Sequence, residues 1–275
     1  MEVYIPDGVS RQQALGRTTH LAIAAHQDDI EIMAYHGILE CFARDDKWFT
    51  GVVVTNGSGS PRSGLYEKYS DEDMMKIRIG EQKKAALVGD YSAQILLDCT
   101  SSEVKNPKNL VIIDSITEII MECKPQVIYV HNLADKHETH VGVALKTIKA
   151  LRGISAEYLP EKVYGCEVWR ALDWMNDDEK VQLDVAGRSN LENALLGVFD
   201  SQICGGKRYD LAAVGRRLAN ATYAQSHSVD ESSALIFAMD LTPLILDKTL
   251  DICSYATGFI EKFKADVESK ITRLS

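Results

Sequence analysis

Two clusters of histidine and carboxylate residues each follow a short apolar segment of the chain. The first cluster is AHQDD at residues 25–29, directly after the apolar residues 21–24. The second is HNLADKHETH at residues 131–140, after the apolar residues 127–130. A catalytic zinc site usually takes three histidine or carboxylate ligands and leaves one position open for water. We therefore expect the two clusters to meet and to hold one divalent metal ion.

The spacing within the clusters suggests a role for each side chain. His26 and Asp29 are three positions apart, which can aim both at one point across a strand-to-helix turn, and His140 would supply the third ligand. Asp28 is placed to take a proton from a water molecule that the metal acidifies towards a pKa of ~7. His137, one helical turn before His140, is placed to stabilise an oxyanion or to donate to a leaving amine. Together these residues predict a hydrolase that acts on an amide.

The elements that must position these residues follow from hydrophobic periodicity. Four apolar segments alternate with helical patterns, and they are residues 20–25, 48–55, 94–98 and 126–131. Helices are predicted over about 30–44, 71–88 and 139–152, and one more with Asn106 as its N-cap and Pro107 at its first position. Apolar strands separated by helices favour a parallel sheet covered on both faces. Its strands end at one edge, where ligands bind, and both clusters lie there.

The second half of the chain is less regular. Its pattern predicts two strands joined by a polar turn at 175–178, then helices, a further short strand and one or two amphipathic helices. These elements are strands 162–169 and 180–185, helices 189–203 and 207–224, strand 234–239 and helical residues 244–272. We expect a single domain over residues 1–275, with a core of about 18–205 and an irregular C-terminal elaboration of about 206–275.

Composition excludes several classes of function. A net charge of −10 argues against binding to nucleic acid phosphates or to an acidic membrane surface. The six cysteines form no C-x-x-C pair and favour reduced thiols in a cytosolic protein. No apolar segment reaches the ~18 residues of a membrane span, and residues 1–19 lack a signal-peptide pattern. We expect a cytoplasmic enzyme with a core of substantial size.

The motifs resemble those of the PIG-L / LmbE-like zinc N-deacetylases. The family motif A-H-P-D-D corresponds to AHQDD at 25–29, and H-N-x-x-D-x-H-x-D-H corresponds to HNLADKHETH at 131–140. Weaker matches are R-x-x-E at 78–81, A-A-x-x-G at 85–89, T-N-G at 55–57 and S-Q at 201–202. The resemblance covers about residues 20–205 in the same order.

The resemblance implies a fold, a cofactor and a reaction. It implies a Rossmann-like three-layer α/β sandwich with a mostly parallel sheet. His26, Asp29 and His140 would bind Zn²⁺, or another divalent metal in exchange, with Asp28 as the general base and His137 as the electrophilic or acid histidine. Arg78 would contact the substrate. Family substrates are mostly N-acetylglucosamine-containing sugars or their conjugates, so the resemblance implies removal of an N-acetyl group from such a small molecule.

Two positions depart from the family motifs. Gln27 stands in place of a proline, which removes a restraint on the turn but no ligand. Thr139 replaces an aspartate that orients and charges the histidine two positions before it. We therefore predict a lower pKa for His137 than in relatives with aspartate. Whether Asp135 or Glu138 compensates is left open.

Other interpretations are kept beside these. Asp28 or Asp29 would also serve as a helix N-cap, and Arg78 as a surface salt-bridge partner. His131 is expected to support the site rather than to bind the metal, and His20, His36 and His227 to be structural. The segment 56–64 is interpreted as a rim loop, and Trp169 and Trp174 as sugar-stacking or packed residues. The alternative function is a non-catalytic carbohydrate-binding or scaffold protein, and the sugar, the pathway and a homo-oligomeric state are left open.

Overall fold

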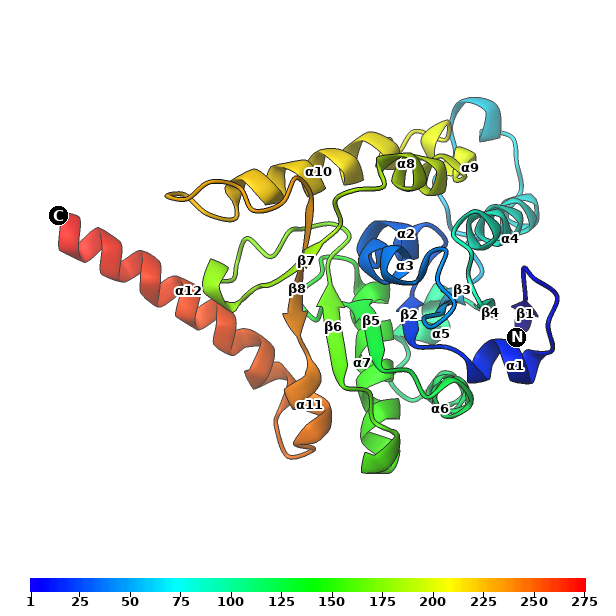
Figure 1. Cartoon of the computed structure of the whole chain (residues 1–275), viewed down its shortest axis with the longest axis horizontal. Helices are drawn as coiled ribbons and strands as arrows, with labels where there is room; N and C mark the ends of the chain where they lie inside the picture. The colour runs from blue at the N-terminus through cyan, green and yellow to red at the C-terminus, as the bar shows by residue number, and fades with distance from the viewer.

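The computed structural model describes all 275 residues and contains one eight-stranded mixed sheet (Figure 1). Its strand order is β1-β4-β3-β2-β5-β6-β8-β7. The strands are β1 (Glu2–Tyr4), β2 (His20–Ala24), β3 (Phe49–Thr55), β4 (Ala93–Cys99), β5 (Val127–His131), β6 (Lys162–Cys166), β7 (Val181–Asp184) and β8 (Leu235–Asp240). The five strands from β4 to β6 in this order are parallel, whereas β1, β8 and β7 pair antiparallel with their neighbours.

Helices cover both faces of the sheet and bury one large apolar cluster on each. On one face lie α1 (Arg11–Gly16), α5 (Ser101–Lys105), α6 (Val111–Cys123), α7 (Glu138–Gly153) and α11 (Thr242–Leu246). On the other lie α2 (Asp29–Met33), α3 (Tyr35–Cys41), α4 (Asp71–Val88), α8 (Ser189–Gly197) and α10 (Tyr209–Tyr223). The short α9 (Asp200–Ile203) precedes α10, and α12 (Ile252–Leu274) ends the chain. This confirms the three-layer α/β sandwich with a mostly parallel sheet.

The strand order of the sheet reverses between β2 and β5. Strands β2, β3 and β4 follow one another towards one edge, and β5 then returns to pair with the free side of β2, with Ile23 opposite Val130. Such a switch point leaves a crevice at the carboxyl ends of the two strands, where ligands bind in open α/β sheets. Both polar clusters of the sequence begin at these two strand ends.

The local structure departs from the sequence patterns at three points. Asn106 does not begin a helix: α5 ends there, and its side chain accepts a hydrogen bond from the N–H of Lys108 in a turn before α6. The segment 30–44 forms two helices, α2 and α3, separated at Ala34. Strands β6 and β7 do not pair with each other, because β8 lies between them. The strand β1, which has three residues at the sheet edge, was not predicted at all.

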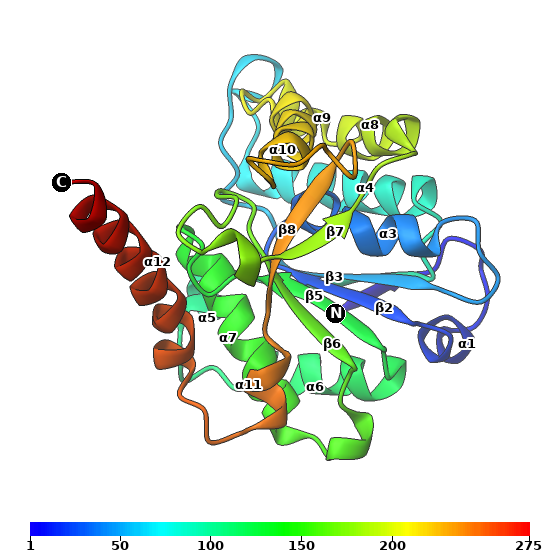
Figure 2. The same ribbon diagram turned by 60° about the vertical axis from the view of Figure 1, so that its left-hand side comes forward.

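The last third of the chain contributes to the same sheet through β8 and ends in a projecting helix. Figure 2 shows α12 leaving the body at its base, so that its C-terminal half extends away from the other elements. The division of the chain near residue 205 stays a prediction. No helix is long and apolar enough to cross a membrane. All six cysteines are free thiols.

Candidate metal centre and active site

His26, Asp29 and His140 bring three ligand atoms together at the switch point. His26 follows β2, Asp29 begins α2, and His140 lies in the first turn of α7. Nδ1 of His26 is 3.1 Å from Oδ2 of Asp29 and 3.1 Å from Nε2 of His140, and the last two atoms are 3.3 Å apart. Bonds of about 2.0–2.1 Å in a tetrahedral zinc site separate neighbouring ligand atoms by about 3.4 Å. The three atoms therefore fit one face of such a tetrahedron.

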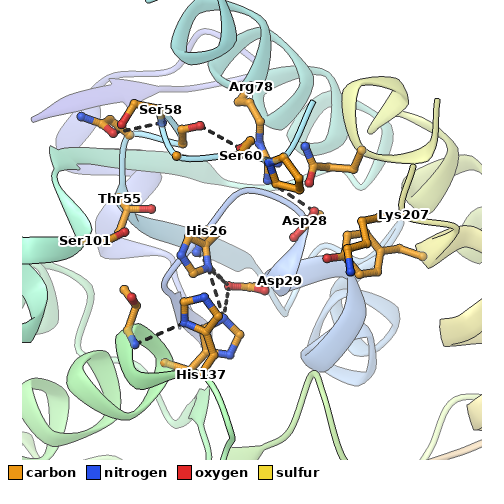
Figure 3. A pocket seen from close by; sticks show the side chains of 18 of the residues that line it. His26, Asp28, Asp29, Thr55, Ser58, Ser60, Arg78, Ser101, His137 and Lys207 are labelled. Carbon is orange, nitrogen blue, oxygen red and sulfur yellow. Dashed lines mark hydrogen bonds and ion pairs between the residues drawn. The ribbon is translucent and has the colours of Figure 1, made fainter. Parts of the chain in front are cut away.

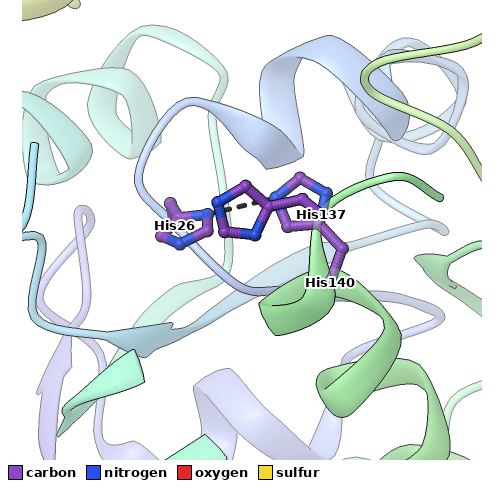
Figure 4. Close-up of side chains that lie close together, drawn as sticks. All are labelled: His26, His137 and His140. Carbon is purple, nitrogen blue, oxygen red and sulfur yellow. Dashed lines mark hydrogen bonds between the residues drawn. The ribbon is translucent and has the colours of Figure 1, made fainter. Parts of the chain in front are cut away.

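His137 also lies at this point, but its hydrogen bonding argues against ligation. Its ring stacks on that of His140, with 4.7 Å between the ring centroids, and meets the ring of His26 edge-on at a centroid distance of 5.0 Å. Figure 4 shows the three imidazole rings close together. Nδ1 of His137 accepts the N–H of Thr139 and caps α7. The neutral ring therefore carries its proton on Nε2, which makes that atom a hydrogen-bond donor rather than a metal ligand.

His131 contacts both the backbone of the first cluster and the ring of His140. Its Nε2 accepts the backbone N–H of Ala25 at 2.8 Å, so this lone pair is not free for a metal. The ring stacks on His140 at 3.8 Å. Burial, together with the neighbouring charge of His140, lowers the pKa of His131 to about 4. The neutral ring of His131 therefore holds the ring of His140 by stacking and the backbone at Ala25 by its hydrogen bond.

Asp28 is buried beside the three ligand atoms and is held by Arg78. Nη2 of Arg78 donates to Oδ2 of Asp28 at 3.3 Å and to the carbonyl of Gln27, and Nη1 donates to Ser60 at 3.0 Å (Figure 3). Burial raises the pKa of Asp28 well above its ordinary value, although the charge of Arg78 opposes this. A carboxylate with a raised pKa is a better proton acceptor. Arg78 is thus an internal partner of Asp28 that also lines the pocket, not a surface salt-bridge residue.

The turn between His26 and Asp29 is held without a proline. Gln27 is buried and its Nε2 donates to the carbonyl of Thr55 at 3.0 Å, which ties the turn to the end of β3. Gly57, at φ +76°, passes so close that a Cβ there would lie 2.7 Å from Oε1 of Gln27. The side chain of Gln27 thus restrains the turn, although the sequence predicted that this restraint was lost with the proline.

Neither aspartate of the first cluster caps the following helix. Asp28 occupies the N-cap position of α2 at φ +88°, but its side chain makes no capping hydrogen bond. Asp29 Oδ2 instead accepts the N–H of His26 at 2.8 Å. The carboxylates are therefore turned towards the site, and the helix-cap interpretation is wrong.

Opposite charges surround His140. Burial disfavours its charged form, but Asp29 and Asp135 outweigh this and raise the pKa of His140 to about 10. Burial would likewise raise the pKa of Asp29, yet His140 and His131 bring it well below its ordinary value. Nδ1 of His140 is 3.2 Å from Oδ2 of Asp135. Asp135 therefore orients the ring through Nδ1 and leaves Nε2 towards the site, an arrangement found in many metal-bound histidines.

No carboxylate takes the place of the missing aspartate beside His137. Asp135 is directed to the His140 ring, and it meets His137 only by accepting its backbone N–H. Glu138 is exposed, with Lys105 as its nearest cation at 3.8 Å. Burial and the charges of His140 and His26 lower the pKa of His137. The comparison of His137 with relatives that have aspartate at position 139 stays a prediction.

The site opens into a polar pocket of about 390 Å³. The rim loop 56–61 forms one wall, as expected for the segment after β3. The other wall comes from residues that the sequence left without a firm role: Trp169, Gln202, Lys207 and Tyr209. Trp174 lies outside it and donates from Nε1 to Glu167.

Gln202 is the most informative pocket residue to which the sequence analysis assigned no role. It is 3% exposed and its Nε2 has no hydrogen-bond partner, although it lines the pocket. Buried amides normally have a partner, so this one is available to a ligand. The only sequence signal was the Ser201-Gln202 pair. Ser201 donates to Glu81 from both its N–H and its hydroxyl, which fixes the segment.

The remaining histidines lie away from this pocket. Nδ1 of His36 is 2.7 Å from the hydroxyl of Tyr129, and Nδ1 of His20 is 2.9 Å from the hydroxyl of Thr19. His227 is exposed. The structural role expected for His20 and His36 fits these contacts.

Several solved structures share the fold at low sequence identity. The N,N'-diacetylchitobiose deacetylase of Pyrococcus horikoshii is 13% identical, with a TM-score of 0.64 and coverage of 86% of this chain and 88% of that one. The 4-carboxy-2-hydroxymuconate hydratase GalB of Pseudomonas putida KT2440 is 16% identical, with a TM-score of 0.60 and coverage of 82% and 96%. The zinc-inhibited form of teicoplanin deacetylase Orf2 is 13% identical, with a TM-score of 0.60 and coverage of 81% and 97%. At these identities, the likeness establishes the fold alone.

Sequence comparison relates part of the chain to a known family. No curated protein sequence matches the chain, but the family model described as PIG-L: GlcNAc-PI de-N-acetylase matches residues 21–151. This segment runs from β2 to α7 and carries both polar clusters and Arg78. Residues 21–151, which carry every candidate metal-binding and catalytic residue, are thus the part of the chain that matches the PIG-L family model.

Proposed function

We propose that the protein is a zinc-dependent hydrolase that removes the N-acetyl group from an N-acetylglucosamine-like sugar or its conjugate. The observation that carries the proposal is the set of three ligand atoms of His26, Asp29 and His140, which lie 3.1–3.3 Å from one another at the floor of an open polar pocket. The match to a family of de-N-acetylases supports the choice of an amide as the bond that is cleaved.

The residues around the ligand atoms have distinct roles in this reaction. A zinc ion held by His26, Asp29 and His140 would polarise the acyl carbonyl and acidify a water molecule. Asp28 accepts a proton from the attacking water and later returns one to the leaving amine nitrogen. His137 donates from Nε2 to the oxygen that gains negative charge. Arg78 holds the carboxylate of Asp28 in place and lines the pocket beside it.

Two other functions are distinguishable by experiment. One is hydration, because the neighbour GalB, which has this fold, is a hydratase. The other is sugar binding without turnover, which the departures from the family motifs at Gln27 and Thr139 would permit. Release of a primary amine is specific to the deacetylase. It is absent in a hydratase, and a binding protein would retain the sugar unchanged.

The direct test is fluorescamine detection of released amine across a panel of N-acetylated sugars, with and without a chelator. We expect turnover that the chelator abolishes and added Zn²⁺ restores. Asp28→Asn should keep the metal and lose activity by at least about 100-fold, the lower range for a general base. The matched control is Asp178→Asn, which removes an exposed carboxylate outside the pocket. Full activity in Asp28→Asn would contradict the mechanism.

A further inference from the structure

The C-terminal half of α12 carries an apolar stripe that is exposed over most of its length; only Phe263 is half-buried, where it borders a cavity next to Trp174. Its base is anchored: Ile252, Tyr255 and Phe259 pack on the core, and the Tyr255 hydroxyl donates to the carbonyl of Asp240. Beyond this base the helix projects from the body in both views (Figures 1 and 2). Ile260, Val267, Ile271 and Leu274 are 38%, 38%, 62% and 79% exposed.

The stripe has a regular spacing. Ile260, Phe263, Val267, Ile271 and Leu274 recur every three or four residues, which places them on one face of a helix. They are also symmetric about Val267: Phe263 and Ile271 each lie four positions from it, and Ile260 and Leu274 each seven. A stripe with this symmetry is complementary to itself when a second helix runs in the opposite direction.

We infer that α12 pairs antiparallel with α12 of a second copy of this chain, about a two-fold axis at Val267. Ile260 then faces Leu274 of the second copy, Phe263 faces its Ile271, and the two Val267 side chains meet. Such a contact is isologous and closes as a dimer. The paired segment is about 21 Å long at 1.5 Å per residue.

The charges at the edges of the stripe fit this arrangement. Lys264 and Glu268 lie along one edge, and Asp266 and Lys270 along the other, because residues four apart share a side of the helix. In the antiparallel pair, like edges of the two copies adjoin. Lys264 then approaches Glu268 of the second copy, and Lys270 approaches its Asp266. Each edge therefore joins opposite charges across the interface.

Two alternatives fit the stripe less well. Helices that lie on membrane surfaces carry a polar face rich in lysine and arginine, whereas this helix places Glu261, Asp266 and Glu268 among its cations. A parallel pair would bring both bases side by side at an interaxial distance of about 8–10 Å. The bodies attached at those bases are wider, so only the antiparallel pair leaves the full stripe free to pack.

The first test is the mass of the full chain in solution by light scattering after gel filtration. At about 100 µM we expect a mass approaching twice the 30.5 kDa of one chain. Val267→Asp should raise the dissociation constant at least about tenfold, because it places a charge in an apolar contact. The matched control Ala265→Asp adds the same charge on the opposite face and should leave the dimer intact. A wild-type monomer at this concentration, or equal dimerisation of the two variants, would overturn the proposal.

The second test fixes the orientation. In a Cys204→Ser/Cys253→Ser background, which removes the two exposed thiols, a mixture of Ile260→Cys and Leu274→Cys chains should form a mixed disulfide on mild oxidation. Ile260→Cys alone should form none, since the two positions 260 lie at opposite ends. Disulfides between two positions 260 would refute the antiparallel arrangement. Wild-type chains that stay monomeric and sediment with phosphatidylglycerol vesicles would assign the stripe to a membrane surface instead.

Folding and activity of each variant serve as controls in both tests. No residue of α12 lines the pocket, so far-UV circular dichroism and amine release by each variant should equal those of the wild type. These readouts separate loss of pairing from loss of folding.

Discussion

Replacing Arg217 by methionine should destabilise the protein and disturb the proposed metal centre from a distance. Arg217 lies on α10, outside the segment that matches the family model, and is 2% exposed. It pairs with Glu192, and its Nη2 donates to the carbonyls of Glu31 and Ile32 at 2.7 and 3.0 Å. These carbonyls end α2, the helix that begins with Asp29. Arg217 therefore fixes a helix that carries a candidate ligand.

The magnitude follows from the burial of the pair. Removing one partner of a buried ion pair costs about 3–5 kcal/mol, because the other charge stays buried and uncompensated. With a urea m-value of about 3 kcal/mol/M, Arg217→Met should lower the unfolding midpoint by about 1–1.7 M. The double variant Arg217→Met/Glu192→Leu should recover at least half of the loss, since replacing both charges by apolar residues is often neutral.

The assay is urea unfolding followed by circular dichroism for the wild type, both single variants and the double variant. The exposed pair Arg208–Asp210 supplies the control: Arg208→Met should leave the unfolding midpoint close to that of the wild type, because exposed ion pairs contribute little to stability. A loss below about 1 kcal/mol for Arg217→Met, or a double variant as unstable as the single one, would refute this reasoning.

Three further predictions concern the site and its surroundings. Burial and two neighbouring histidines lower the pKa of His137. Thr139→Asp should raise this pKa, because it places a negative charge beside the ring. An unchanged basic limb of the pH–rate profile would contradict this prediction. Gln202→Ala should raise KM about tenfold with little change in kcat, because one hydrogen bond to the substrate is lost; an unchanged KM would show that the free amide meets no substrate. Burial raises the pKa of Glu31 from 4.5 to about 7. Between these two pH values, Glu31 stays protonated in the folded state but releases its proton in the unfolded chain. The free energy of unfolding therefore falls as the pH rises, by up to about 3 kcal/mol. Glu31→Gln should flatten this part of the stability curve measured by thermal unfolding, and an equal slope in both proteins would contradict the assignment.

The sequence was sufficient to predict the parallel strands and the two clusters at their ends. Unbroken apolar runs such as residues 127–130 identify buried strands locally, and the rule that parallel strands end at one edge brings His26 and His140 to the same side of the sheet. The pairing of β2 with β5 was not predictable from periodicity, because strand order depends on contacts between residues about 100 positions apart.

The details around the ligands depend on such long-range contacts too. The sequence predicts a looser turn at Gln27, whereas in the structure the Gln27 amide donates to the carbonyl of Thr55 and holds the turn. Asn106 has the composition of an N-cap, yet the same side chain closes a turn after α5. The strand β8 lies between β6 and β7, although it follows both in the sequence. Local propensity does not distinguish these outcomes, since each is decided by a partner far along the chain.

The most direct test of the proposed metal centre is the zinc content of the purified protein and of single histidine variants. We predict about one zinc per wild-type chain, loss of this zinc in His140→Ala, and full retention in His227→Ala, which removes an exposed histidine outside the pocket. Equimolar zinc in His140→Ala would contradict the proposed centre of His26, Asp29 and His140.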